Sequence, residues 1–323
     1  MHPTKNASTD FERQFNPPKV SVIVVMYNQT WTELIKTLDS IVCQERIDFE
    51  IIVCDDGSEK KFENELNNYF FIKGFCHYSL ILHGHNGGTV SNYYSGLEAA
   101  RGKYAKLISP GDYLVGSRTL YEWTRFMEEN NAEWSFSDTI YYRFITDREE
   151  YISTSAKPQF TKSYVKGNKA RCMWNYLALR DAANGAAVLG LTELQKQYCG
   201  ILKEKGIIYC EDYIYRLMVF HEHVGTYFPK AAVGYRFASG VSSSHSTIWK
   251  DKLQKDKNTM IQVLLSEKAD TKLKTRIKKA IIRSRKAGRL NTLLIRGNIM
   301  LRLKRHFFPR LTPLPEDVGS NHL

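Results

Sequence analysis

The chain has 323 residues, of which 43% are hydrophobic and 12% aromatic. This composition is that of a globular protein with a sizeable core, and it excludes an intrinsically disordered chain. Six cysteines are present without a C-x-x-C pair, so the sequence encodes neither a zinc ribbon nor a redox dithiol. We expect six reduced thiols and therefore a reducing compartment.

The net charge of +12 comes from one segment near the C-terminus. Between Thr271 and Pro315 there are fourteen Lys or Arg residues and no Asp or Glu, so the rest of the chain would carry about −2. Within it, residues 293–308 interleave apolar and basic residues, which is typical of an interfacial helix on an anionic membrane. A solvated helix that packs its apolar side on the main domain is the alternative. Nucleic acid is disfavoured as a partner, because no recognised binding module accompanies the charge.

No stretch of the sequence reaches the roughly 18 consecutive apolar residues of a membrane span. The polar residues 1–18 contain no apolar core of a signal peptide. We therefore expect a cytoplasmic protein that is neither secreted by a signal peptide nor integral to a membrane.

Strand and helix patterns alternate over the first third of the chain. The run Val20–Met26 is almost entirely β-branched, as expected for a strand buried on both faces of a parallel sheet. Thr30, followed three residues later by Glu33, forms a candidate capping box before a helix. Further strands are predicted at 49–54, 78–82 and 104–108. The segments between successive strands are predicted to be helices, the second of them ending at about position 70 and the third covering 89–101. This alternation predicts a doubly wound α/β layer, in which ligands bind beyond the carboxyl ends of the strands.

The second half is less regular. Residues 138–170 are aromatic without a sustained period, and we expect a long functional or mobile loop there. Order returns with a strand at 186–191 and a helix after it, and a buried helix is predicted over 213–220. The remainder, 246–323, is predicted to be helical and basic.

Each of the four N-terminal strands ends in a polar, turn-forming cluster. The clusters are Tyr27-Asn28, Asp55-Asp56-Gly57-Ser58, His85-Asn86-Gly87-Gly88 and Ser109-Pro110-Gly111-Asp112. Strand-to-helix connections need such residues in any case. Carboxylates can also accept hydrogen bonds from a base or a ribose, and glycines let the backbone approach a phosphate closely. The dinucleotide and P-loop glycine motifs are absent, so a nucleotide at this edge would be bound in another way.

The order of these motifs resembles the family-two glycosyltransferases of the GT-A fold. The segments VSVIVVMYN and VCDDGS, and an N-G-G followed by a small-residue helix, come at the spacings of that family. The resemblance covers roughly residues 18–245 and is strongest over 19–114. It implies an α/β fold of the GT-A class, which is a Rossmann-like mixed sheet of nucleotide-diphospho-sugar transferases, followed by a C-terminal helical, basic extension.

This resemblance also implies a division of the chain and a donor site. A polar tail (1–18) would precede a transferase domain (19–245), with a nucleotide-binding half (19–114) and an acceptor-side half (115–245), and the helical basic region (246–323) would follow. The donor is expected to be an NDP-sugar, with a UDP-sugar preferred. Its binding residues are expected to be Tyr27, Asn28, Asp55, Asp56, Asn86, Gly87, Asp112 and Arg236. Among these, Asp56 is expected to contact the base.

The sequence departs from the family where a metal ligand is expected. The family motif G-E-Y-I-x-x-L-D-x-D-D corresponds here to GKYAKLISPGD, in which Ser109 and Gly111 replace two aspartates and only Asp112 remains. A divalent cation, Mn²⁺ or Mg²⁺, would then be held by Asp112 and the donor phosphates alone. A tight turn would also explain the Pro-Gly-Asp segment fully.

Two other outcomes of this departure stay open. A cation such as Arg236 or a lysine of the basic segment could stabilise the leaving diphosphate, or activity could be lost. His245, in a Ser-rich turn, is a further candidate for the metal or the diphosphate, although a histidine in such a turn is more often simply solvated.

The pair Glu211-Asp212 is the second candidate site. In the family an E-D pair opens a helix on the acceptor side, and the resemblance implies that Asp212 is the general base of an inverting displacement, with Glu211 orienting it or binding the acceptor. Acidic residues at a helix N-terminus also favour the helix macrodipole without any catalytic role.

We therefore expect an inverting glycosyltransferase that moves a sugar from an NDP-sugar to a glycan or a lipid-linked saccharide in cell-surface polysaccharide biosynthesis. It would be peripheral on the inner face of the membrane through residues 271–310. The alternative is a catalytically degenerate nucleotide-sugar-binding or scaffold protein, because Ser109 and Gly111 break the metal motif. A nucleotidyltransferase would need a Gly- and Lys-rich loop after the first strand, which is absent.

Overall fold

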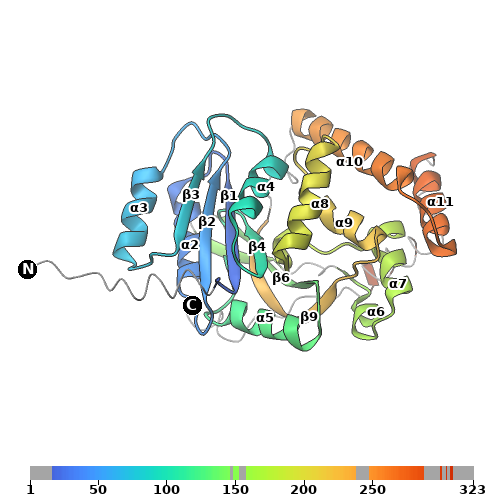
Figure 1. Cartoon of the computed structure of the whole chain (residues 1–323), viewed down its shortest axis with the longest axis horizontal. Helices are drawn as coiled ribbons and strands as arrows, with labels where there is room; N and C mark the ends of the chain where they lie inside the picture. Colours follow the sequence, from blue (N-terminus) through green and yellow to red (C-terminus); the bar gives the residue numbers. More distant parts are fainter. Residues whose placement is uncertain are drawn as a thin grey trace, which may run out of the picture.

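The computed structural model describes residues 17–145, 148–152, 158–237 and 247–286, together with positions 299, 303, 306 and 307. Its centre is one mixed sheet of nine strands in the order β3-β2-β1-β4-β8-β6-β9-β5, with β7 paired to β6. In Figure 1 the N-terminal strands lie at one end of the molecule, and the helices α10 and α11 lie at the other.

Four parallel strands make up the N-terminal half of the sheet, as the sequence predicts. They are β1 (Val20–Met26), β2 (Phe49–Asp55), β3 (Tyr78–Leu82) and β4 (Tyr104–Ile108). The connecting helices are α2 (Trp31–Val42), α3 (Glu63–Ile72) and α4 (Thr89–Ala99). Because the strands are parallel, their polar carboxyl-terminal clusters meet at one edge of the sheet.

Alternate residues of the central strands point to opposite faces of the sheet and belong to two separate hydrophobic cores. Ile23 and Val25 of β1 belong to the cluster that includes α4 and extends to the C-terminal helices, whereas Val22 and Val24 belong to the cluster with α2 and α3 on the other face. This explains the unbroken β-branched run, since both faces of β1 are buried. The capping box is confirmed: the Thr30 side chain accepts from the Glu33 N–H, and the Glu33 carboxylate accepts from the Thr30 N–H at 2.8 Å.

The second half adds strands of both directions. Its strands are β5 (Tyr113–Leu114), β6 (Trp134–Ile145), β7 (Arg148–Ile152), β8 (Val188–Leu191) and β9 (Thr226–Arg236). Its helices are α5 (Thr119–Glu129), α6 (Thr161–Val165), α7 (Lys169–Met173), the π-helix η1 (Trp174–Ala178), the 3-10 helix η2 (Gly185–Ala187), α8 (Thr192–Glu204) and α9 (Tyr213–Phe220). Strand β8 runs antiparallel to β4 and β6, and β9 runs parallel to β6.

The prediction of a long loop over 138–170 is wrong for most of that range, which forms strands and a short helix. The chain continues β6 as far as Ile145 and turns back as β7, so a hairpin stands where no period was visible. Aromatic side chains line both faces of β6: Tyr142 is buried against Tyr113, and Tyr141 packs on Tyr235. The alternation of apolar and polar residues that marks a half-exposed strand is therefore missing.

The basic C-terminal segment contributes two helices to the core. Helices α10 (Thr247–Ser266) and α11 (Lys272–Lys286) bury Met260, Val263, Leu264, Ile277 and Ile281 in the larger hydrophobic cluster. Helix α11 thus packs its apolar side on the main domain. The choice between an interfacial and a packed helix at 293–308 falls on residues that lie outside the described ones apart from isolated positions, and it stays open.

Two further expectations from composition can be compared with the structure. None of the helices among the described residues is long and apolar enough to span a membrane. All six cysteines are free thiols, as the sequence predicts.

Candidate active site

The ends of β1 and β2 are joined by Asn28 and Ser58. The Asn28 N–H donates to Ser58 Oγ at 2.8 Å, and Asn28 Oδ1 accepts from the Glu59 N–H at 2.9 Å. Ser58 Oγ in turn donates to Asp55 Oδ1 at 2.5 Å. Asn28 has a φ of 55°, a left-handed conformation that asparagine tolerates better than most residues. Tyr27, 40% exposed, lies beside this junction.

Asp56 joins the second cluster to the third. Its two carboxylate oxygens accept from the N–H groups of Gly87 and Gly88 at 2.8 and 2.9 Å. The two turns touch through their backbones, because a Cβ on Gly57 would lie 2.5 Å from the carbonyl carbon of His85. Burial raises the pKa of Asp56, and the two glycine N–H groups oppose this. Each oxygen keeps a second lone pair, so the carboxylate can still accept from a ligand.

Two buried acceptors at this edge lack a hydrogen-bond partner among the described residues. They are Asp55 Oδ2 and Asn92 Oδ1. The ammonium of Lys61 lies 3.9 Å from Asp55 Oδ2, and the Asn92 amide donates to the Cys54 carbonyl at the end of β2. Unpaired buried acceptors are costly and uncommon, which favours a ligand that donates hydrogen bonds here.

The fourth cluster brings Asp112 and Arg236 together. Asp112 is 5% exposed, and its Oδ1 accepts from the Arg236 N–H at 2.9 Å. The guanidinium of Arg236 forms an ion pair with Glu33. Burial raises the pKa of Asp112 to about 7, opposed by that N–H and by the positive charge of Lys106. Lys106 is fully buried, and burial lowers its pKa to about 7.

These residues do not fit a divalent cation held by protein carboxylates. Among the described residues no group of three or more His, Cys, Asp or Glu side chains could hold a metal ion. Asp112 is enclosed, the charge of Lys106 acts on it and would oppose a second cation, and Ser109 and Gly111 supply no carboxylate. Mn²⁺ and Mg²⁺ sites are built from several hard oxygen ligands. His245 lies outside the described residues.

The loop that precedes Glu211 lies against the glycine turn. The Val90 N–H donates to the Ile208 carbonyl at 2.9 Å, and a Cβ on Gly88 would overlap Ile208. Asp256, from α10, accepts from three consecutive backbone N–H groups at 3.2, 2.6 and 3.0 Å, those of Ile208, Tyr209 and Cys210. Helices α4 and α8 also pack side by side over the sheet (Figure 1). The acidic pair is therefore held close to the start of α4.

Glu211 and Asp212 are half-buried, and both titrate above their ordinary range. Burial raises the pKa of Glu211 to about 8, and the charge of Asp212 raises it further. Burial also raises the pKa of Asp212, while Arg216 opposes this. Asp212 packs on η2, where a Cβ on Gly185 would lie 2.9 Å from the Asp212 Cβ. The proposed base is thus positioned by close backbone contact as well as by charge.

Three residues that shape this site carried no signal in the sequence. Asp256 lies in the lysine-rich run KDKLQKDKN, where an acidic residue is typical of a solvated helix face. Gly185 and Ile208 belong to no motif, and only the tertiary contacts reveal them. Tyr27, Asn28, Asp55, Asp56, Asn86 and Gly87 lie at one edge as predicted, but their roles toward a ligand stay predictions.

A mixed sheet with polar turns at the ends of parallel strands, and an acidic helix start beside them, is the arrangement of the GT-A class. Residues 21–183, half of the chain, match the model described as "Glycosyl transferase family 2". The chain belongs to that family.

Curated relatives carry similar names. The chain is 26% identical over 216 residues to the "Uncharacterized glycosyltransferase EpsJ" of Bacillus subtilis (strain 168), covering 64% of this chain and 57% of that protein. It is 30% identical over 147 residues to an "Uncharacterized glycosyltransferase" of Rickettsia bellii (strain RML369-C), covering 44% of this chain and 19% of that protein. The chain therefore spans little more than half of the first relative and about a fifth of the second.

Solved structures show the same fold at low identity. S. aureus TarS 1-349 in complex with UDP-GlcNAc is 15% identical, with a TM-score of 0.54 and coverage of 89% of this chain and 78% of that one. The mannosyltransferase PcManGT from Pyrobaculum calidifontis, in complex with GDP-Man and Mn²⁺, is 11% identical, with a TM-score of 0.52 and coverage of 89% and 81%. At these identities the likeness establishes the fold alone.

Proposed function

We propose that the protein is an inverting glycosyltransferase that transfers a sugar from an NDP-sugar to a saccharide acceptor. One observation carries the proposal: the loop before Glu211-Asp212 is hydrogen-bonded to the start of α4, directly after the glycine turn that Asp56 holds. Asp212, as the proposed base, would therefore act next to the proposed nucleotide-binding edge. This proximity is what a single displacement requires.

The donor site is proposed at the ends of β1, β2 and β3. Asp55 Oδ2, a buried acceptor, suits the N–H of a uracil base or a ribose hydroxyl. The turn of Gly87 and Gly88 would pass close to the ribose and the diphosphate. A UDP-sugar is the preferred donor, supported by the TarS structures, which are complexes with UDP and with UDP-GlcNAc.

The displacement needs one base and one group for the leaving diphosphate. Asp212 accepts the proton of an acceptor hydroxyl while that oxygen attacks the anomeric carbon and the bond to the diphosphate oxygen breaks, which inverts the configuration. Glu211, with a pKa of about 8, carries a proton at neutral pH and donates it in a hydrogen bond that orients the acceptor. Arg236, at the fourth cluster, supplies positive charge on the diphosphate side.

We further propose that the protein works at the cytoplasmic face of a membrane in cell-surface polysaccharide synthesis. Helix α11 supports this, because its apolar side is buried while Lys272, Arg276, Lys279 and Arg283 are exposed at helical spacing on the other side. Such a cationic stripe binds anionic lipid electrostatically. Binding to vesicles with phosphatidylglycerol, but not to vesicles of phosphatidylcholine alone, and its loss at high salt would support the proposal. Equal binding to both vesicles would contradict it.

The test of the transferase assignment is Asp212→Asn. We expect kcat to fall about 100- to 10,000-fold, because an amide cannot accept the proton, while calorimetry gives an unchanged Kd for UDP. Glu211→Gln is the matched variant, which keeps the hydrogen-bond donor and should retain most of the activity. Turnover by Asp212→Asn at the wild-type rate would contradict the assignment.

A degenerate nucleotide-sugar-binding protein is the second candidate, favoured by the enclosure of Asp112 against Lys106. A screen of UDP- and GDP-sugars that scores release of free nucleotide distinguishes the two. Binding of UDP without turnover of any donor would favour the binding protein.

A further inference from the structure

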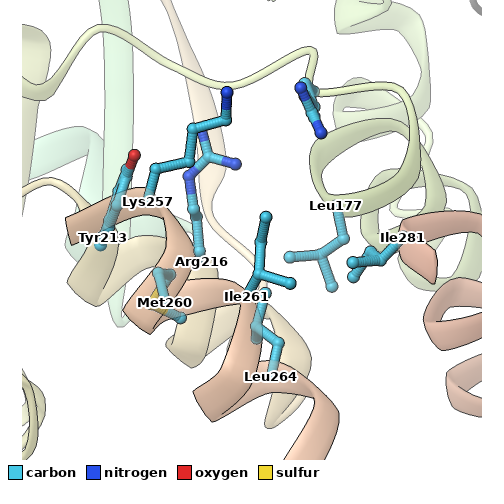
Figure 2. Close-up of a pocket in the computed structure, with 9 residues that line it drawn as sticks. Leu177, Tyr213, Arg216, Lys257, Met260, Ile261, Leu264 and Ile281 are labelled. Atoms are coloured by element: carbon cyan, nitrogen blue, oxygen red, sulfur yellow. The ribbon is translucent and has the colours of Figure 1, made fainter. Parts of the chain in front are cut away.

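A separate pocket lies behind α9, between this helix, α10 and α11. Its volume is about 90 Å³, or about three water volumes. Figure 2 shows the cationic ends of Lys257 and Arg216 near one another on one side, with Leu177 and Ile281 on the other and Leu264 below. The pocket thus combines an apolar floor with a rim of positive charge.

Three cations line this rim. They are Arg180, Arg216 and Lys257. Among the described residues, no ion pair within 4.0 Å includes any of the three. The Nε of Arg216 is buried and has no hydrogen-bond partner in this part of the chain. Arg180 donates a long hydrogen bond to Ser284 Oγ at 3.4 Å, and Lys257 donates one to Gln254 Oε1 at 3.3 Å.

The three charges repel one another. Burial lowers the pKa of Lys257, and the positive charges of Arg180 and Arg216 lower it further. Burial, followed by the charge of Arg216, lowers the pKa of Arg180 in the same way. Grouping like charges with an unsatisfied donor is unfavourable in the unliganded protein, and a bound anion would relieve both costs.

The backbone around the rim is also unusual. Arg180 has a φ of 57°, in the left-handed region, and it follows the π-helix η1. Single π-helical turns and strained non-glycine residues concentrate at functional sites. Here they hold Arg180 where it lines the pocket, although the residue is also exposed to solvent.

The pocket is adjacent to the proposed base. Arg216 follows Asp212 by four residues on α9, which is about one helical turn, or about 6 Å along the axis. The Arg216 guanidinium also lies 4.9 Å from the centre of the Tyr213 ring, which lines the same pocket. A molecule whose charged group binds at the rim could therefore extend as far as Asp212.

We propose that Arg180, Arg216 and Lys257 bind a phosphate group of the acceptor, so that the acceptor is a phosphate ester and not a neutral glycan. The proposal rests on the proposed function, because it takes Asp212 as the base that faces the acceptor. Guanidinium groups bind phosphate through paired, charge-assisted hydrogen bonds, and the pocket volume suits a phosphate with its first carbons. The carbons could belong to a polyol or to a lipid chain.

Calorimetry without donor tests the pocket directly. The probes are inorganic phosphate, glycerol 3-phosphate and dimethylallyl phosphate, with glycerol and dimethylallyl alcohol as their uncharged counterparts. We expect both esters to bind and neither alcohol to do so. Tighter binding of glycerol 3-phosphate identifies a polyol phosphate, and tighter binding of dimethylallyl phosphate identifies a lipid phosphate. Esters that bind no better than the alcohols would overturn the proposal.

Matched variants locate the binding. Lys257→Gln and Arg180→Asn should each weaken ester binding at least about tenfold, and asparagine tolerates the left-handed backbone at position 180. Lys255→Gln, on an exposed face of the same helix, should bind the esters like the wild type. Equal affinities in Lys257→Gln and Lys255→Gln would overturn the proposal. If the esters bind as expected but Asp212→Asn retains turnover, the phosphate pocket stands and the proposed function fails.

Discussion

The proposed donor edge, at the ends of β1, β2 and β3, and the proposed acceptor side, around Glu211 and Asp212, are held together in different ways. At the donor edge the motif residues bind one another: Asp56 holds the glycine turn, and Ser58 joins Asn28 to Asp55. On the acceptor side, Glu211 and Asp212 are held by residues outside any motif, above all Asp256 of α10. The donor edge is therefore a self-contained unit, whereas the acceptor side depends on how later helices pack.

The strongest test of this contrast is Asp256→Ala. Removing a buried carboxylate leaves three backbone N–H groups unsatisfied, and we expect the free energy of unfolding to fall by about 3 kcal/mol. Urea titration measures that loss. At temperatures where the variant is folded, transfer should be impaired while the Kd for UDP is retained. Loss of UDP binding in the folded variant would mean that the two parts are not independent.

Gly185→Ala tests the positioning of Asp212 alone. The added Cβ would lie 2.9 Å from the Asp212 Cβ, so the acidic residue must shift, while the alanine itself adopts an ordinary backbone conformation. We expect kcat to fall about 100-fold with little change in the Kd for UDP, since displacements of this kind are costly to catalysis. Gly206→Ala, where nothing lies within 4 Å, controls for general glycine effects, although its positive φ adds local strain. Wild-type kcat in Gly185→Ala would contradict the packing argument.

Asp56→Asn is the counterpart at the donor edge. An amide offers one acceptor oxygen, so one of the two glycine N–H groups loses its bond to residue 56 and the turn loosens, although Asn86 Oδ1 still accepts from the Gly88 N–H. We expect the Kd for UDP to rise about tenfold. Binding of phosphate esters at the second pocket serves as the control and should be unchanged. A UDP affinity equal to that of the wild type would contradict a role for this turn in donor binding.

The smallest effect is a shift in the pH profile of Arg216→Gln. Asp212 must be ionised to act as a base, burial raises its pKa, and Arg216 lowers it. Without Arg216 the pKa of Asp212 rises, so the loss of kcat/KM on acidification should begin at a higher pH than in the wild type. Lys255→Gln is the control, because Lys255 is exposed on α10, is outside both proposed sites and is not among the groups that shift Asp212. An acid limb that stays in place would show that Asp212 is not the titrating base.

The sequence predicts the donor half well because its signals are local. The β-branched run of β1, the capping box of Thr30 and the turn clusters are each contained within a few residues, and parallel pairing brings them together. The helix over Tyr213–Phe220 follows from its apolar composition in the same way.

The other half could not be predicted because its order is set by distant contacts. Strand β6 is stabilised by pairing with β7, β8 and β9. Aromatic residues lie on both of its faces, so the sequence lacks the alternation of apolar and polar residues that predicts a strand. Gly185 and Asp256 become meaningful only when η2 and α10 pack beside α9. No pattern within a short window of sequence carries such information.

The burial of Asp112 and Lys106 has a consequence for the charge balance of the proposed donor edge. A cluster of aspartates repels a diphosphate until something neutralises it. Here the one remaining carboxylate is buried, and the positive charge of the buried Lys106, whose ammonium donates to the carbonyls of Leu107 and Ala186, partly offsets it. A donor diphosphate bound as proposed would therefore meet little negative charge at the fourth strand end, with the guanidinium of Arg236, ion-paired to Glu33, at its margin.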